Sequence, residues 1–177
     1  PKIVGDTPSK PSGGAEEIVW SADSENVYFA LRVADKNEAL STNFDIYRSH
    51  QNYDSAQNLT PDNKATDTLP AASPDGKYLY FLSNRKATNQ LFRMALPQGI
   101  VAQPAQQVSQ FKTDISGFKL SPDGKLIAIW GDIARECLSF DCEKDGDRSK
   151  PGPGTMPIRL SPSITVSRQP GASVVTM

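Results

Sequence analysis

The chain is poor in the residues from which most metal and catalytic sites are built. Its 177 residues include one histidine, His50, and two cysteines, Cys137 and Cys142. A zinc site needs four ligands, so we expect no metal, and we assign no cofactor. No Gly-x-Ser-x-Gly motif occurs anywhere in the sequence, and this motif carries the serine of many hydrolases. We therefore expect no catalytic residue in this chain.

Excess charge and long apolar runs are also missing. The chain has 19 basic and 20 acidic residues, a net charge of -1, which argues against nucleic acid as a partner. No apolar run approaches the roughly 18 to 20 residues that span a bilayer, so we expect no membrane span. Twelve glycines and 14 prolines accompany an apolar fraction of only 37%. This turn-rich composition is typical of proteins with short β-strands.

The sequence does contain an internal repeat. Residues 21–31, 73–83 and 121–131 align without a gap and read SADSENVYFAL, SPDGKYLYFLS and SPDGKLIAIWG. Their spacing is close to the roughly 40 to 50 residues of one four-stranded propeller blade. The repeat therefore predicts a β-propeller architecture.

Each copy of the repeat begins with a turn. Proline presets φ at the second turn position, Ser and Asp side chains bond nearby amides, and glycine takes the left-handed conformation that closes the turn. Ser24 stands where the other copies have glycine, so we expect strain in the first turn. The turn residues of interest are Ser21, Asp23, Ser73, Pro74, Asp75, Gly76, Ser121, Pro122, Asp123 and Gly124.

The remaining strands of each blade follow from the same alignment. Third strands are expected at 45–48 and 90–93, fourth strands at 56–60 and 105–109, and matching links at 66–67 and 113–114. The predicted fold is all-β: a partial propeller of two four-stranded blades plus part of a third, with an irregular C-terminal segment. The expected divisions are a linker or incomplete preceding element at 1–15, blades at 16–64 and 65–111, the start of a third blade at 112–136, and a loop insertion and irregular tail at 137–177.

Aromatic residues fall on the predicted strands. We expect them to fill the layers between blades, where large side chains supply most of the buried area. They are Trp20, Tyr28, Phe29, Tyr80, Phe81, Phe92, Phe118 and Trp130.

Two stretches, SPDGKYLYFLSNRKATNQLFRMAL and ISGFKLSPDGKLIAIWGD, resemble blades of the amino-terminal β-propeller of the prolyl oligopeptidase family of serine peptidases. The similarity is greatest to the bacterial acylaminoacyl-peptidase and dipeptidyl-aminopeptidase-like branch, and it covers roughly residues 16–150. In that family the propeller caps a C-terminal α/β-hydrolase domain and restricts which peptides reach its active site. The resemblance implies that hydrolase domain and short peptides as partners, and a serine peptidase as the parent protein.

Propellers of the periplasmic Tol system use the same turn, so a scaffold that binds protein partners is the alternative function. Fewer than four blades seldom close a ring. We therefore expect a fragment or truncated product that is marginal alone or self-associates through its open blade edges.

Cys137 and Cys142 lie within the predicted insertion, which resembles a cysteine-containing segment after the same blade in some family members. They form either a local disulfide or two free thiols. A periplasmic or otherwise exported location, which we favour over the cytoplasm, would promote the disulfide.

Overall fold

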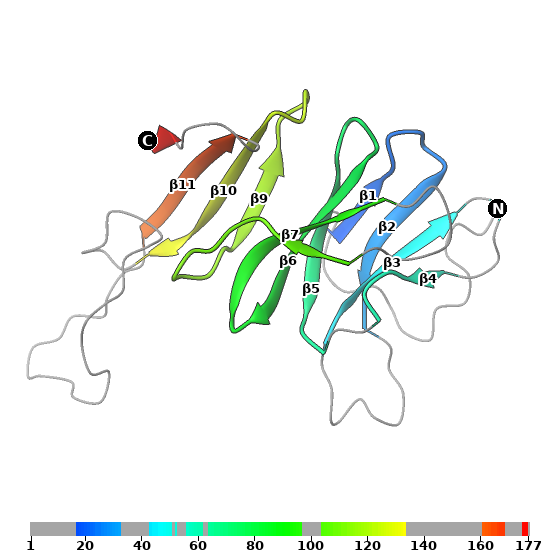
Figure 1. The fold of residues 1–177 in the computed structure, drawn as a ribbon, viewed down its shortest axis with the longest axis horizontal. Coiled ribbons are helices and arrows are strands. Elements are labelled where there is room, and N and C mark those ends of the chain that lie inside the picture. The colour runs from blue at the N-terminus through cyan, green and yellow to red at the C-terminus, as the bar shows by residue number, and fades with distance from the viewer. Residues whose placement is uncertain are drawn as a thin grey trace, which may run out of the picture.

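Three four-stranded antiparallel sheets follow one another along the molecule (Figure 1). The computed structural model describes residues 17–32, 43–50, 52, 56–61, 64–96, 104–133, 161–168 and 175–176. All its described elements apart from turns are strands, which confirms the predicted all-β class. Among these residues no helix is long and apolar enough to cross a membrane.

In each sheet the strands pair in chain order, so every sheet is a meander. The first sheet consists of β1 (Ile18–Trp20), β2 (Asn26–Leu31), β3 (Asp45–His50) and β4 (Gln57–Asn58). The second consists of β5 (Asp67–Ala72), β6 (Tyr78–Lys86), β7 (Thr88–Ala95) and β8 (Gln106–Gln107). The third consists of β9 (Gly117–Leu120), β10 (Leu126–Ile133), β11 (Ser161–Arg168) and β12 (Val175–Thr176).

The third sheet differs from the expectation in one respect. We expected only the start of a third blade and an irregular segment from residue 137, but β11 pairs with β10 along its whole length and β12 pairs with β11. The tail does not repeat the sequence of the other third strands, which is why alignment missed it. Its Ile164, Thr165 and Val166 are β-branched residues, which suit the open edge of β10.

The sheets pack face to face because successive residues of a strand point to opposite sides. In β6, Leu79 and Phe81 point to the first sheet, whereas Tyr80 and Leu82 point to the third. Between the first and second sheets the buried core contains Tyr28, Ala30, Ile46, Leu59, Leu79, Phe81, Phe92 and Met94. Between the second and third sheets it contains Tyr80, Leu82, Leu91, Ile115, Phe118, Ile127 and Ile129. A second strand buried on both faces explains its continuous apolar sequence.

The segments that link one sheet to the next, at 66–67 and 113–114, are equivalent in a register one residue different from the one predicted. The amide of Asp67 donates to the carbonyl of Phe44, and the amide of Ile115 donates to the carbonyl of Asn89 in the same way. Asp67 is therefore equivalent to Ile115, and the shared Thr-Asp pattern at 66–67 and 113–114 was the wrong guide. The gapless count back from Ser73 and Ser121 gives the correct register.

Candidate functional site

The connections between strands gather at two opposite ends of the sheets. The turns between first and second strands all lie at one end, uppermost in Figure 1, and the β6–β7 hairpin lies at the other. In a meander the links from one sheet to the next also lie at the hairpin end. We define the turn rim as residues 21–25, 73–77 and 121–125, and the hairpin rim as residues 43–45, 58–60, 66–67, 83–89 and 113–115.

Each turn on the turn rim is closed by a serine and an aspartate. The Ser73 hydroxyl donates to Oδ1 of Asp75 at 2.6 Å and accepts from the amide of Tyr78 at 2.9 Å. Oδ1 of Asp75 also accepts from the amide of Lys77 at 3.1 Å. The amide of Gly76 donates to the carbonyl of Ser73 at 2.9 Å. One side-chain pair thus satisfies the amides of a tight turn between two buried strands.

The other two turns repeat this arrangement. The Ser121 hydroxyl donates to Asp123 at 2.6 Å and accepts from Leu126 N at 2.9 Å. In the first turn Ser21 donates to Asp23, whose carboxylate accepts from the amide of Glu25 at 2.9 Å. These hydrogen bonds hold the pKa of all three aspartates below the ordinary value, the serine hydroxyl being the largest cause in each.

Successive turns also touch one another. A Cβ placed on Gly124 would lie 3.1 Å from Cδ of Pro74, and one placed on Gly76 would lie 3.7 Å from Cβ of Ala22. The second residue of each turn therefore packs against the fourth residue of the next. Ser24 adopts φ 62° although it has a side chain, close to the 70° of Gly76. The rim is a row of rigid turns whose polar side chains already bond one another.

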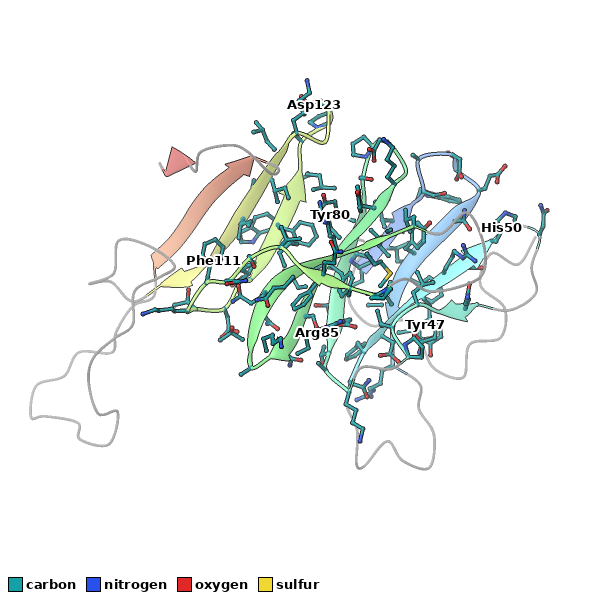
Figure 2. The ribbon with its side chains drawn as sticks, viewed as in Figure 1. Tyr47, His50, Tyr80, Arg85, Phe111 and Asp123 are labelled. Carbon is teal, nitrogen blue, oxygen red and sulfur yellow. The ribbon has the colours of Figure 1, made fainter. Side chains whose placement is uncertain are left out.

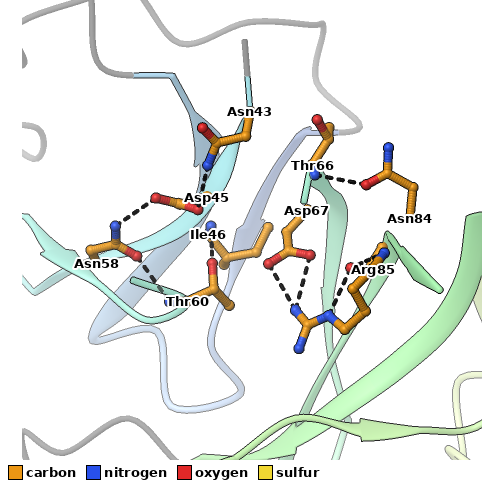
Figure 3. Close-up of polar contacts among 10 residues, drawn as sticks. Asn43, Asp45, Ile46, Asn58, Thr60, Thr66, Asp67, Asn84 and Arg85 are labelled. Carbon is orange, nitrogen blue, oxygen red and sulfur yellow. Dashed lines mark hydrogen bonds and ion pairs between the residues drawn. The ribbon is translucent and has the colours of Figure 1, made fainter. Parts of the chain in front are cut away.

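The hairpin rim contains a buried ion pair (Figure 3). Nη2 of Arg85 lies 3.0 and 2.9 Å from the two carboxylate oxygens of Asp67, and Nε of Arg85 donates to the hydroxyl of Ser83 at 2.8 Å. Asp67 is fully buried, and Arg85 has 21% of its side chain exposed. The guanidinium carbon lies 4.7 Å from the ring centre of Phe92 and 5.5 Å from that of Phe81. Arg85 is thus fixed between two aromatic rings and an acid, and its outer edge faces solvent.

Asp45 is a second acid at this rim. Asn58 Nδ2 donates to it at 2.8 Å and Asn43 Nδ2 at 3.3 Å (Figure 3). Partial burial raises the pKa of Asp45, and the nearby charge of Asp67 adds to the effect. Both acids occupy the junction of the first two sheets, where carboxamide groups stabilise Asp45 and a cation stabilises Asp67.

Glu17 forms an inter-sheet contact that sequence reasoning missed. Its carboxylate accepts a 2.8 Å hydrogen bond from the amide of Leu69, in the second sheet. Leu69 has φ 52° and lies where the pairing of β5 with β6 shifts register. A β-bulge leaves an amide without a ladder partner, and Glu17 supplies the acceptor. The aligned repeat sequences do not predict this β-bulge.

His50, the one histidine of the chain, is the last residue of β3. Its imidazole is 18% exposed, and Nε2 lies 3.7 Å from a carboxylate oxygen of Glu25. Within the described part of the chain no three His, Cys, Asp or Glu side chains are grouped to hold a metal ion. Cys137 and Cys142 lie outside the described residues, so the disulfide stays a prediction.

The aromatic side chains divide into two groups. Six of the eight are buried, and Tyr80, for example, lies between the second and third sheets (Figure 2). Trp20 and Trp130 differ, since 54% and 38% of them are exposed. The expectation that all eight fill layers between blades is wrong for these two, which are exposed on the outer faces of the first and third sheets. Phe29 is buried, but it too lies on the outer face of the first sheet, in a separate cluster with Val27 and Leu31.

Comparison with known proteins adds two kinds of likeness. No protein-family model matches the chain. Dipeptidyl-peptidase 5 of Porphyromonas gingivalis is 35% identical over 79 residues, which are 44% of this chain and 12% of that protein. Dipeptidyl-peptidase 5 of Porphyromonas endodontalis is 34% identical over 79 residues, 11% of its length. The match therefore spans a small part of these curated relatives.

Solved structures share the fold at low sequence identity. Acylaminoacyl peptidase of Pyrococcus horikoshii superposes with a TM-score of 0.57 at 20% identity, over 85% of this chain and 22% of that one. TolB of Acinetobacter baumannii superposes with a TM-score of 0.60 at 18% identity, over 91% of this chain and 31% of that one. These likenesses support a propeller fold and do not separate the two protein classes.

The two sequence relatives that we report are both dipeptidyl-peptidases. The relatives and the solved structures together confirm the resemblance of this chain to the propellers of the prolyl oligopeptidase family of serine peptidases.

Proposed function

We propose that this chain is a non-catalytic propeller segment of a prolyl-oligopeptidase-family peptidase, which limits the access of peptides to a hydrolase domain. The 79-residue match at 35% identity to a dipeptidyl-peptidase carries the proposal. The sequence has no Gly-x-Ser-x-Gly motif, and His50 is its only histidine. Bond cleavage is therefore assigned to a domain that these 177 residues do not contain.

Two features of the fold support a role in access. The connections at the turn-rim end run from five residues, as at 21–25, to ten residues, at 96–105, whereas those at the hairpin end run from one residue to 27. Residues 32–44 connect β2 to β3 and residues 134–160 connect β10 to β11, but Ala87 alone connects β6 to β7. In repeat proteins, insertions that gather on one face often mark the binding face. We therefore assign the hairpin rim as the surface that faces peptides on their way to the hydrolase domain.

A chimera tests the proposal. The matched stretch of this chain replaces its counterpart in dipeptidyl-peptidase 5 of Porphyromonas gingivalis, and kcat/KM is measured for a fluorogenic dipeptide substrate and for longer peptides. We expect hydrolysis of the dipeptide substrate to survive, with a changed ratio of long to short substrates, because the segment shapes access and not chemistry.

The matched control carries the equivalent stretch of TolB from Acinetobacter baumannii, which has the same fold without the sequence match. A chimera no more active than this control, or one with an unchanged length ratio, would contradict the proposal. The 177-residue chain alone should not react with a fluorophosphonate probe, because its sequence has no Gly-x-Ser-x-Gly motif. Labelling of the chain would overturn the non-catalytic assignment.

The Tol-type scaffold remains the alternative function. The fold likeness to TolB is as close as the likeness to the peptidases, so it gives the scaffold no advantage.

A further inference from the structure

Arg85 has two N–H groups for which the described part of the chain provides no acceptor. A guanidinium carries five N–H donors in one plane. In Arg85, Nε donates to the hydroxyl of Ser83, and Nη2 donates to both carboxylate oxygens of Asp67. No described residue accepts a hydrogen bond from Nη1, and no dashed line reaches this nitrogen in Figure 3. Two of the five donors therefore remain for a ligand.

Nη1 is also open to solvent. Within the residues that the structure describes, one buried side-chain nitrogen or oxygen has no hydrogen-bond partner, and it is Oδ1 of Asn26. Nη1 of Arg85 has no partner either, so it is not among the buried atoms. An approaching ligand can reach it without any rearrangement of the chain.

The rest of the Arg85 side chain is held in place. Its guanidinium carbon lies 4.7 Å from the ring centre of Phe92 and 5.5 Å from that of Phe81. The fully buried carboxylate of Asp67 fixes its other side. A long side chain that is already ordered loses little conformational freedom when it binds a ligand.

The internal repeat shows that the fold does not require charges at these two positions. In the other two copies the equivalents of Asp67 and Arg85 are apolar: Ala15 and Val33 in the first copy, Ile115 and Ile133 in the third. Ile115 is buried between the second and third sheets. A buried ion pair is seldom more stabilising than apolar residues of similar volume. A binding role for the guanidinium accounts for this departure of the second copy.

We propose that Nη1 of Arg85 binds a carboxylate of a peptide, either at its C-terminus or on an aspartate or glutamate side chain. The planar N–H donors of arginine match the geometry of a carboxylate, and hydrogen bonds between charged partners are the strong ones. Arg85 belongs to the hairpin rim, so the identification of the ligand as a peptide rests on the proposed function.

The surroundings of Arg85 offset the repulsion between Asp67 and a second carboxylate. Lys86 follows Arg85 in the same hairpin and is exposed. Asp114, an exposed acid of the hairpin rim, accepts a 2.7 Å hydrogen bond from the amide of Asn89. Charges at a protein surface act over several ångströms and are screened by salt. Carboxylate binding should therefore weaken as the salt concentration rises.

Nuclear magnetic resonance of the 177-residue chain tests the proposal with three acetylated tripeptides. Acetyl-Ala-Ala-Ala has a free C-terminal carboxylate, acetyl-Ala-Asp-Ala-amide has a side-chain carboxylate, and acetyl-Ala-Asn-Ala-amide has neither. The Nε–H signal of Arg85, identified by its loss in Arg85→Lys, is expected to shift with one or both acidic peptides and not with the asparagine peptide. A shift with only one acidic peptide identifies the source of the carboxylate.

Three variants show which group binds, with affinity followed by the backbone amide signals of residues 83–89. Arg85→Lys keeps a cation beside Asp67 but removes Nη1, and it should weaken binding of the acidic peptide at least about tenfold. The double variant Asp67→Ile, Arg85→Met has the wild-type net charge and should not bind. Arg93→Lys is the matched control, because the guanidinium of Arg93 lies over the ring of Tyr78 in the same sheet; it should bind as wild type.

Three results would overturn the proposal. They are equal shifts with the acidic and asparagine peptides, wild-type affinity in Arg85→Lys, and no shift of the Arg85 signal at the highest attainable peptide concentration. The chimera described above has a separate readout. If the chimera fails but the chain binds acidic peptides, the proposed function is wrong and the carboxylate site stands. If the chimera behaves as expected but the chain does not bind, only the carboxylate site is wrong.

Discussion

Nη2 of Arg85 lies 3.0 and 2.9 Å from the two carboxylate oxygens of Asp67, at the position where the next sheet has the buried Ile115. The same core position therefore holds an ion pair at one sheet junction and an aliphatic side chain at the other. Removing one partner of a buried pair leaves an uncompensated charge, whereas replacing both with apolar groups can be neutral.

We predict that Arg85→Ala destabilises the chain by about 3 kcal/mol or more, because Asp67 remains buried without its cation. The double variant Asp67→Ile, Arg85→Met should unfold close to the wild-type midpoint, since Ile115 shows that isoleucine fits this position. Urea unfolding followed by circular dichroism measures both. A double variant as unstable as Arg85→Ala would show that the pair has a role that apolar packing does not replace.

The turn rim predicts a loss of stability in acid. The pKa values of Asp23, Asp75 and Asp123 lie below the ordinary 3.8 in the folded chain. A lowered pKa adds stability above the unfolded value, and this stability is lost as pH falls through the folded pKa. The melting temperature should therefore fall below about pH 4, and replacing all three with asparagine should flatten this part of the profile. An equal acid loss in the triple variant would assign it to other groups.

Asp45 should respond to pH in the opposite direction. Burial raises its pKa, so its contribution is fully present below the unfolded value and is lost as pH rises through the folded pKa. Asp45→Asn keeps an oxygen that accepts from Asn58 and removes the charge. We expect the variant to melt higher than wild type at pH 7 and at the same temperature at pH 3. A lower melting temperature at pH 7 would mean that the hydrogen bonds from Asn43 and Asn58 to the carboxylate outweigh the cost of burying its charge.

The turn glycines form a matched pair for testing backbone and packing effects separately. Gly76 and Gly124 have nearly the same φ, 70° and 69°, but an added Cβ has ordinary contact distance at Gly76 and a close approach to Pro74 at Gly124. We expect Gly76→Ala to cost about 1 kcal/mol from left-handed strain alone and Gly124→Ala to cost more. Thermal unfolding measures the difference, and equal costs would show that Pro74 moves aside freely.

Ser24→Gly is the reverse test of the same turn. Relief of the strain at φ 62° outweighs the added freedom of glycine in the unfolded chain, so we expect a gain of about 0.5 kcal/mol. Thermal unfolding measures this gain as well. A loss of stability would show that the serine side chain has a stabilising contact in the turn.

Gly117 is predicted to set the position of Trp130. Gly117→Ala should lift the indole from the sheet and shift its fluorescence emission to longer wavelength, measured with Trp20→Phe so that Trp130 is the only tryptophan. Lys119→Ala, an exposed change on the same strand, is the control and should leave the emission unchanged. Unchanged emission in Gly117→Ala would show that the ring does not depend on this contact.

The local pattern was readable because it is repeated. Three gapless copies locate the turns and the buried second strands, since the turn needs particular residues and a strand covered on both faces needs an apolar run. The same gapless alignment also gives the register of the segments between sheets, in which Asp67 is equivalent to Ile115. The Thr-Asp match was misleading because it aligned residues that are one position apart in the repeat. The pairing of β11 was not readable, because a strand far along the chain is chosen by the edge it fits.

The sequence by itself determined the all-β class, the repeated turns, the resemblance to a peptidase propeller and the lack of a hydrolase motif, because each depends on residues close together in the chain. Only the tertiary structure decided which polar groups meet. The Asp67–Arg85 pair, the Glu17 contact with a strained Leu69, and the exposure of Trp20 and Trp130 all depend on how separate sheets stack. Stacking places residues together by distance in space, which no local pattern records.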